Sequence, residues 1–130
     1  MSDITEQIQD IVTTEPVALF MKGTPAFVAC GNSQRALDAL RSVGAPVAAV
    51  NILPDPRIRQ ELSELYGWPT IPQVFVGGEL VGGADIVQEL AASGELEATL
   101  DQKLGPEWRG GREERTIALA DRGNPFRLVS

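Results

Sequence analysis

The chain has 130 residues, of which 43% are hydrophobic, and a formal net charge of −7. This length fits one domain with a single core, and the acidic charge repels phosphate backbones, so we expect no nucleic-acid binding. The sequence shows neither an apolar stretch of membrane-spanning length nor a basic-then-apolar leader, so we expect no membrane anchor and no signal peptide. Its single cysteine cannot form an internal disulfide, which favours a reducing compartment and a cytoplasmic location.

Hydrophobic periodicity and turn residues predict alternating helices and strands. In the first half of the chain, we expect a helix over 4–12 with Ser2 as its N-cap, a strand over 17–21, a helix that follows Cys30 and ends before Gly44, and a strand over 47–52. A third helix then opens at 54–56 and reaches Leu65. Two strands, over 73–76 and 79–81, are joined by Gly77-Gly78, and helices over 86–90 and 96–104 follow them. Strands joined by a helix pair in parallel, and the hairpin adds an antiparallel edge. The predicted fold is therefore α/β, with a mixed four-stranded sheet and helices on both faces.

Residues 105–130 lie outside this plan. Residues 1–104 carry 6 Lys/Arg against 14 Asp/Glu, whereas residues 105–130 carry 5 against 4. The run from Thr116 to Ala120 is compatible with an extra strand or with a tail, and the sequence leaves both open. We therefore expect a domain over residues 1–104, followed by a C-terminal extension over 105–130.

Cys30 lies between a predicted strand and a predicted helix, in a chain that has no histidine. A helix N-terminus favours a thiolate through its free N–H groups and its dipole, and Lys22 at the end of the neighbouring strand adds a second positive charge. The pKa of Cys30 should therefore lie below the ~8.5 of a free thiol. The alternative is a small buried hydrophobic residue, the usual environment of an isolated cysteine. Position alone favours neither interpretation, but any thiol chemistry needs a second sulfur from outside the chain.

Two further segments carry candidate ligand contacts. Thr70-Ile71-Pro72 follows a loop rich in breakers, where a cis X–Pro bond would leave the preceding backbone N–H and C=O free for an extended ligand. Alternatively, Pro72 simply begins an edge strand. Asp85 begins a helix after Gly82-Gly83, where it either caps the helix or receives the ammonium group of a ligand. In this acidic chain, three cations stand out as candidate anion contacts: Lys22, Arg57 and Arg59.

Together these segments resemble a known family. The matching residues are Met21-Lys22-Gly23-Thr24-Pro25, Cys30-Gly31-x-Ser33, Asn51-Ile52-Leu53, Arg57-Ile58-Arg59, Trp68-Pro69-Thr70-x-Pro72-Gln73 and Gly82-Gly83-x-Asp85-Ile86-Val87. In order and spacing they are similar to the monothiol glutaredoxins of the Cys-Gly-Phe-Ser type, from about residue 3 to residue 104. The resemblance implies a thioredoxin-like (glutaredoxin) fold, in agreement with the predicted element order. It does not extend to residues 105–130.

The resemblance also implies a glutathione site and a role for Cys30. The implied glutathione-binding residues are Lys22 and Arg59 for the glycyl carboxylate, Thr70, Ile71 and Pro72 for the cysteinyl part, and Ala84 and Asp85 for the γ-glutamyl end. Cys30 resembles the thiolate that ligates a 2Fe–2S cluster shared by two protomers. In that arrangement each protomer supplies one cysteine and one bound glutathione, so that thiolate sulfurs hold both irons.

Three functions follow from this resemblance. The first is a carrier that binds the cluster as a homodimer and delivers it to apoproteins in iron–sulfur assembly and redox homeostasis. The second is a weak glutathione-dependent oxidoreductase in which Cys30 attacks a mixed disulfide, so the sequence leaves open whether the protein is an enzyme. The third is a regulatory module for BolA-type proteins, with Arg109, Arg112 and Arg115 as candidate contacts. The alternative for these arginines is a solvated or edge-packed extension.

Two positions depart from the family pattern. Asn32 stands where the family has phenylalanine, and Ile71 stands where an aromatic residue is common. Asn32 removes an apolar shield beside the thiolate and offers an amide that can hydrogen-bond sulfur. We therefore expect greater solvent access and a more labile cluster. Ile71 keeps the bulk and the apolar character of the position.

Overall fold

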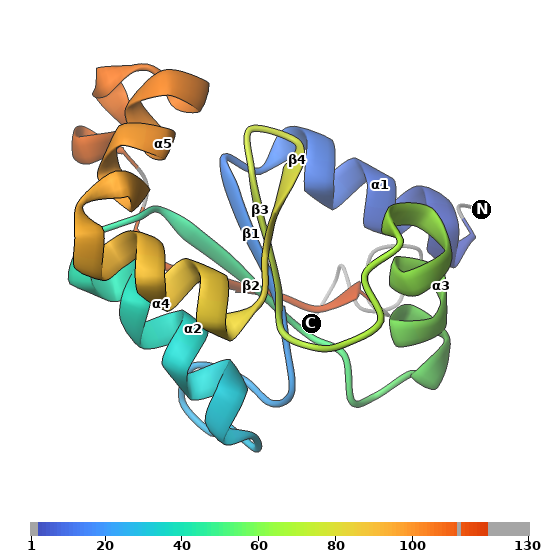
Figure 1. The fold of residues 1–130 in the computed structure, drawn as a ribbon. Coiled ribbons are helices and arrows are strands. Elements are labelled where there is room, and N and C mark those ends of the chain that lie inside the picture. The colour runs from blue at the N-terminus through green and yellow to red at the C-terminus, as the bar shows by residue number, and fades with distance from the viewer. Residues whose placement is uncertain (1–2, 112, 120–130) are drawn as a thin grey trace.

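A mixed β-sheet with helices on both faces forms the centre of this computed structural model, which describes residues 3–111 and 113–119 (Figure 1). The elements are α1 (Ile4–Thr14), β1 (Val17–Met21), α2 (Gly31–Ser42), β2 (Val47–Asn51), α3 (Pro56–Tyr66), β3 (Gln73–Val76), β4 (Glu79–Gly82), α4 (Ala84–Ser93), α5 (Glu95–Leu104), the 3-10 helix η1 (Pro106–Gly110) and β5 (Arg115–Ile117). As far as α5, this is the order of helices and strands that the sequence predicts.

The strands of the described residues lie in the order β4-β3-β1-β2-β5. β1 pairs with β2 in parallel and with β3 antiparallel, and β3 continues into β4 through a hairpin. The two turn residues of that hairpin, Gly77 and Gly78, have positive φ angles of 57° and 85°, as a type I′ turn requires. β1 and β2 are buried on both faces, which explains why they read as continuous apolar runs.

Each face of the sheet has its own hydrophobic core. Helices α2, α4 and α5 cover one face, and α1 and α3 cover the other (Figure 1). Successive residues of β1 point to opposite faces, so Leu19 and Met21 join the first core, whereas Ala18 and Phe20 join the second. The first core therefore fixes α2 and α4, whose N-terminal ends carry the candidate site.

One helix cap differs from the prediction. Asp3, rather than Ser2, is the N-cap of α1, and its carboxylate accepts a hydrogen bond from the Glu6 N–H at 2.8 Å. Ser2 lies outside the described residues. The end of α2 agrees with the prediction, because the chain leaves the helix at Gly44 with a φ of 72°.

The described part of the extension packs against the rest of the fold. Trp108 of η1 is 6% exposed in the first core, and Leu119 is 3% exposed in the second. β5 pairs with β2 in parallel, so the sheet has five strands over the described residues rather than the four expected. Of the two alternatives that the sequence leaves open, the structure has the extra strand, but it spans Arg115–Ile117, and Ala118 and Leu119 of the predicted run lie outside it. Ala120 lies outside the described residues.

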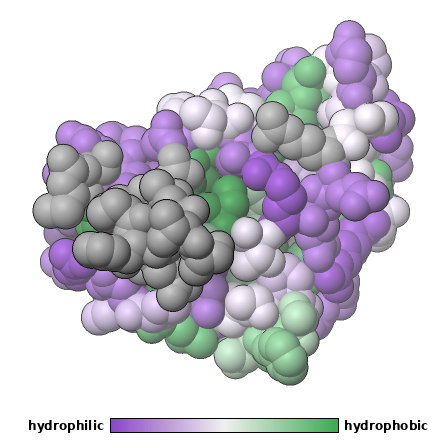
Figure 2. Space-filling view, turned by 180° about the vertical axis from the view of Figure 1, so that it is seen from behind, coloured by the Kyte–Doolittle hydropathy of each residue, from purple (hydrophilic) through white to green (hydrophobic). Residues whose placement is uncertain are grey.

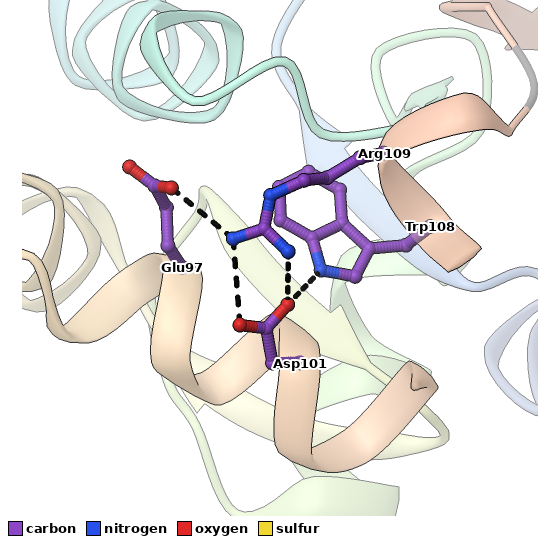
Figure 3. Close-up of polar contacts among 4 residues, drawn as sticks. All are labelled: Glu97, Asp101, Trp108 and Arg109. Atoms are coloured by element: carbon purple, nitrogen blue, oxygen red, sulfur yellow. Dashed lines mark hydrogen bonds and ion pairs between the residues drawn. The ribbon is translucent and has the colours of Figure 1, made fainter. Parts of the chain in front are cut away.

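Arg109 of η1 forms ion pairs with two carboxylates of α5 (Figure 3). Its guanidinium pairs with the carboxylates of Glu97 and Asp101, and it lies over the Trp108 ring at 4.5 Å from the ring centroid. The indole N–H of Trp108 donates to Asp101 Oδ1 at 2.7 Å. One arginine and one tryptophan thus converge on the same carboxylate, which connects the extension to the helix before it.

Two more arginines form ion pairs across the boundary of the extension. Arg115 pairs with Glu15, and Arg41 of α2 forms two hydrogen bonds with Glu114, at 2.7 and 2.8 Å. Arg115, which the sequence offers as a partner contact, is therefore engaged within the chain, as is Arg109. Arg112 lies outside the described residues.

Most of the surface seen in Figure 2 is hydrophilic, and hydrophobic side chains appear there in separate small areas. Over the described residues, the large hydrophobic side chains that remain exposed are Phe27 (83%), Leu53 (52%) and Ile86 (38%). The loops of Phe27 and Leu53 meet at Asn51, whose amide oxygen accepts the N–H groups of Gly23 and Leu53 at 2.9 and 3.0 Å. None of the described helices combines the length and the apolar character needed to cross a membrane.

Candidate thiol and ligand site

Cys30 is the N-cap residue of α2, with an extended backbone (φ −150°, ψ 131°). The hydrogen bonds that hold the loop between β1 and Cys30 include those from Ala29 N–H to Lys22 O at 3.0 Å and from Gly23 N–H to the Asn51 amide oxygen at 2.9 Å. Cys30 is partly exposed, so its interpretation as a fully buried hydrophobic residue is wrong. The thiol lies at the strand-to-helix junction that the sequence predicts.

The pKa of the Cys30 thiol lies below its ordinary value. The largest cause is the backbone N–H of Ser33, which hydrogen-bonds the thiolate, whereas partial burial opposes it by disfavouring the charged form. The N–H of Asn32, the Ser33 hydroxyl and the charge of Lys22 also lower the pKa. The predicted activation by a helix N-terminus and a lysine is confirmed, and the first helical turn contributes more than the lysine.

Ser33 acts on the Cys30 thiol and is absent from the predicted site. Its side chain is fully buried (0% exposed), and its hydroxyl accepts a hydrogen bond from the Lys22 backbone N–H at 3.0 Å. This bond connects the end of β1 to the first turn of α2. The Cys30-Gly31-x-Ser33 motif could have indicated this role of Ser33, because a buried serine hydroxyl needs a hydrogen-bond partner.

A pocket of about 330 Å³ lies between the first turn of α2, the loop before β3 and the start of α4. It is lined by Asn32, Trp68, residues 70–72 and residues 83–86. The structure therefore brings together five of the predicted glutathione residues: Thr70, Ile71, Pro72, Ala84 and Asp85. The Ile71–Pro72 peptide is cis, as the sequence suggested. Because β3 lies between β4 and β1, the alternative of Pro72 at the start of an edge strand is wrong.

The predicted cations lie outside this pocket. Arg59 is exposed on α3 and lines a separate groove with Pro69, and Lys22 directly follows β1. Neither forms an ion pair with another residue that the structure describes. Arg57, by contrast, is bound to Asp55 at 2.7 Å between Nη2 and Oδ2. Of the three candidate anion contacts, Lys22 and Arg59 therefore remain.

Gln73, at the start of β3, hydrogen-bonds the loop before that strand, which lines the pocket. It is a second residue absent from the predicted site. It is fully buried (0% exposed), and its amide group donates to Trp68 O at 2.8 Å and to Thr70 O at 3.2 Å. On the opposite wall, a Cβ on Gly83 would lie 3.3 Å from Pro72 O. Glycine at this position therefore lets α4 approach the loop closely.

Asp85 does not cap α4, because Gly83 is the N-cap and no side chain caps the helix. Asp85 instead pairs with Arg35 of α2, with 2.6 Å between Nη2 and Oδ1. Arg35 also donates to the amide oxygen of Asn32 at 3.0 Å. Arg35 is absent from the predicted site because it lies 50 residues from Asp85 along the chain, so no local sequence pattern connects the two.

Comparison with known proteins agrees with this geometry. The profile of the Glutaredoxin family matches residues 17–81. The chain is 43% identical to Monothiol glutaredoxin-5, mitochondrial, of Saccharomyces cerevisiae over 82% of this chain and 74% of that relative, and 45% identical to Glutaredoxin 4 of Escherichia coli K12 over 78% and 89%. The solution structure of reduced poplar apo GrxS14 matches with a TM-score of 0.69 at 42% identity, over 78% of this chain and 93% of that one. The thioredoxin-like fold is therefore confirmed, and the chain belongs to the monothiol glutaredoxin family.

Proposed function

We propose that this protein binds glutathione and carries a 2Fe–2S cluster as cargo between two copies of the chain. The observation that carries the proposal is the environment of Cys30, a partly exposed thiol with a lowered pKa. Cys30 lies two residues before Asn32, which lines the pocket. The thiolate is the form of cysteine that ligates iron, so a lowered pKa favours this role at neutral pH.

Glutathione is the tripeptide that glutaredoxins bind, and the charges of this site suit its two ends. Its glycyl carboxylate would pair with Lys22 and Arg59, the cations that remain unpaired among the described residues. Its cysteinyl part would lie along residues 70–72, and its γ-glutamyl end would contact Ala84 and Asp85. In this orientation the glutathione sulfur would have to reach Cys30, which lies two residues before the pocket-lining Asn32.

The cluster needs more sulfur than one chain supplies. All-thiolate 2Fe–2S clusters are held by four thiolate sulfurs, whereas the chain has one cysteine and no histidine. Two Cys30 thiolates and two bound glutathiones complete the set, so the cluster-bound form would be a homodimer. Its partners would be apoproteins that accept the cluster and, in a regulatory role, BolA-type proteins. We expect these encounters in the cytoplasm.

Anaerobic reconstitution with iron, sulfide and glutathione tests the proposal. We expect a coloured dimer with the visible absorption of a 2Fe–2S cluster, and a colourless monomer from Cys30→Ser or when glutathione is omitted. A colourless monomer from the unmodified protein in the complete mixture would contradict the proposal. Asn32→Phe, reconstituted in parallel, should lose its colour more slowly in air if Asn32 makes the cluster labile.

The lowered pKa of Cys30 also supports a second function, which is thiol–disulfide exchange. The Cys30 thiolate would attack the glutathione sulfur of a protein–glutathione disulfide, and the protein thiolate would leave. A second glutathione thiolate would then attack the Cys30–glutathione disulfide and release Cys30 with glutathione disulfide as product. In a deglutathionylation assay without cluster, appreciable turnover that disappears in Cys30→Ser would favour this enzyme over the carrier.

A further inference from the structure

Arg35 connects α2 to the start of α4 through contacts that none of the predicted roles uses. Its guanidinium donates to Asp85 Oδ1 at 2.6 Å, to the Gln88 amide oxygen at 2.6 and 3.1 Å, and to the Asn32 amide oxygen at 3.0 Å. These bonds engage most of the five N–H donors of a guanidinium. The side chain is therefore occupied by acceptors of the protein itself and has little capacity left for a ligand carboxylate.

The contact alters the charge that Asp85 presents to the pocket. The Asp85 side chain is 87% exposed and lines the pocket, whereas Arg35 is 41% exposed. A carboxylate that already holds a guanidinium attracts a second cation less strongly, because the two charges of the pair largely cancel. Exposed ion pairs are also weak, so an incoming ammonium group can displace the guanidinium.

We propose that Arg35 is a specificity-determining residue of this site, which competes with the ammonium group of the ligand for Asp85 and so weakens the binding of ammonium-bearing ligands. The proposal rests on the proposed glutathione function and adds a residue to it. Asn32 also belongs to this arrangement, because it lines the same pocket as Asp85 and its amide oxygen accepts a hydrogen bond from the Arg35 guanidinium. A ligand that displaces Arg35 from Asp85 therefore also changes the surroundings of the residue that departs from the family pattern.

Binding of glutathione and two analogues to the full chain with reduced Cys30 tests this competition. Glutaryl-Cys-Gly lacks the α-ammonium group, and 4-aminobutanoyl-Cys-Gly lacks the α-carboxylate. In NMR titrations, Arg35→Gln should tighten the binding of glutathione and of the aminobutanoyl analogue by about two- to fivefold, the range that an exposed ion pair allows. Binding of the glutaryl analogue should not change. Arg41→Gln is the matched control, because Arg41 lies on the same helix but pairs with Glu114.

A second variant shows whether Arg35 acts through Asp85. In an Asp85→Asn background, Arg35→Gln should change the affinity of none of the three ligands. Equal affinity of the unmodified protein and Arg35→Gln for glutathione would overturn the competition. Weaker binding of glutathione and of the glutaryl analogue by Arg35→Gln would overturn it as well, because Arg35 would then hold the ligand carboxylate. If neither protein binds glutathione, the proposed function itself is wrong.

Discussion

The hydroxyl of Ser33 accepts a 3.0 Å hydrogen bond from the backbone N–H of Lys22, which ties the first turn of α2 to the end of β1. The same hydroxyl and the Ser33 backbone N–H both lower the pKa of Cys30. One fully buried side chain therefore positions the helix start and stabilises the thiolate. Any change at Ser33 should affect the geometry of the junction and the chemistry of the thiol together.

Ser33→Ala should raise the pKa of Cys30, because it removes the hydroxyl and keeps the backbone N–H. It should also lower the free energy of unfolding by about 1 kcal/mol, since the Lys22 N–H loses its acceptor. The pH dependence of iodoacetamide alkylation measures the first effect and urea unfolding the second. Ser42→Ala is the control, because the Ser42 hydroxyl bonds Ala39 O on the same helix at 2.6 Å, far from the thiol in sequence. An unchanged alkylation profile in Ser33→Ala would exclude the hydroxyl as a stabilising group.

Ionisation of Cys30 should make the stability of the fold depend on pH. The pKa is lowered in the folded protein, so the thiolate adds to the free energy of unfolding at pH values above the unfolded pKa of ~8.5. This contribution is lost as the pH falls through the folded pKa. Unfolding of the unmodified protein and of Cys30→Ser, compared at about pH 6 and about pH 9.5, should show a relative gain for the unmodified protein at the higher pH. A difference that is independent of pH would contradict the lowered pKa.

Gln73→Met should loosen the pocket loop while it preserves the volume of the side chain. Trp68 O would keep only the Ser63 hydroxyl at 3.2 Å, and Thr70 O would lose the donor that now holds it. We expect a loss of roughly 1–3 kcal/mol in the free energy of unfolding, since Gln73 is fully buried. Hydrogen exchange in residues 66–72 should become faster, and glutathione should bind more weakly. Gln102→Met, an exposed position on α5, should change none of these quantities.

Helices and strands whose apolar residues recur at a regular local spacing could be predicted from the sequence. Contacts between segments that are distant along the chain could not. Buried strands and amphipathic helices carry their pattern within a few residues, so their order was correct as far as α5. Ser2 and Asp3 are neighbours with the same capping chemistry, and a local pattern does not choose between them. The strand Arg115–Ile117 is too short to show a period, and its pairing with β2 accompanies the burial of Trp108 and Leu119 in the two cores.

The candidate site divides in the same way. The cysteine, the cis proline and the acidic residue at the start of α4 lie in segments whose turn and helix-start residues are visible in the sequence. The contacts that set their chemistry are tertiary. Arg35 reaches Asp85 only because α2 and α4 pack side by side in the first core. The Ser33 hydroxyl likewise meets Lys22 because β1 ends beside the start of α2.

Trp108→Ala should destabilise the whole domain, although Trp108 lies beyond the region of family resemblance. The indole is 6% exposed in the first core, and its N–H donates to Asp101 (Figure 3). We expect a loss of about 3–5 kcal/mol for the alanine variant and of about 1 kcal/mol for Trp108→Phe, which keeps most of the aromatic volume. Far-UV circular dichroism in urea measures both. Unfolding of Trp108→Ala at the same urea concentration as the unmodified protein would show that the extension is not part of the cooperative unit.

Glu114→Gln should weaken the attachment of the extension in a manner that depends on pH. The Arg41 guanidinium hydrogen-bonds Glu114 and holds the pKa of its carboxyl below the ordinary value. The pair therefore stabilises the fold above the unfolded pKa of ~4.3, and this contribution is lost as the pH falls through the folded pKa. Because the two side chains are 43% and 31% exposed, we expect a loss of at most about 1 kcal/mol at neutral pH. Urea unfolding should show this difference from the unmodified protein shrinking as the pH falls from the unfolded pKa through the folded pKa. A deficit of constant size would instead point to lost packing rather than lost charge.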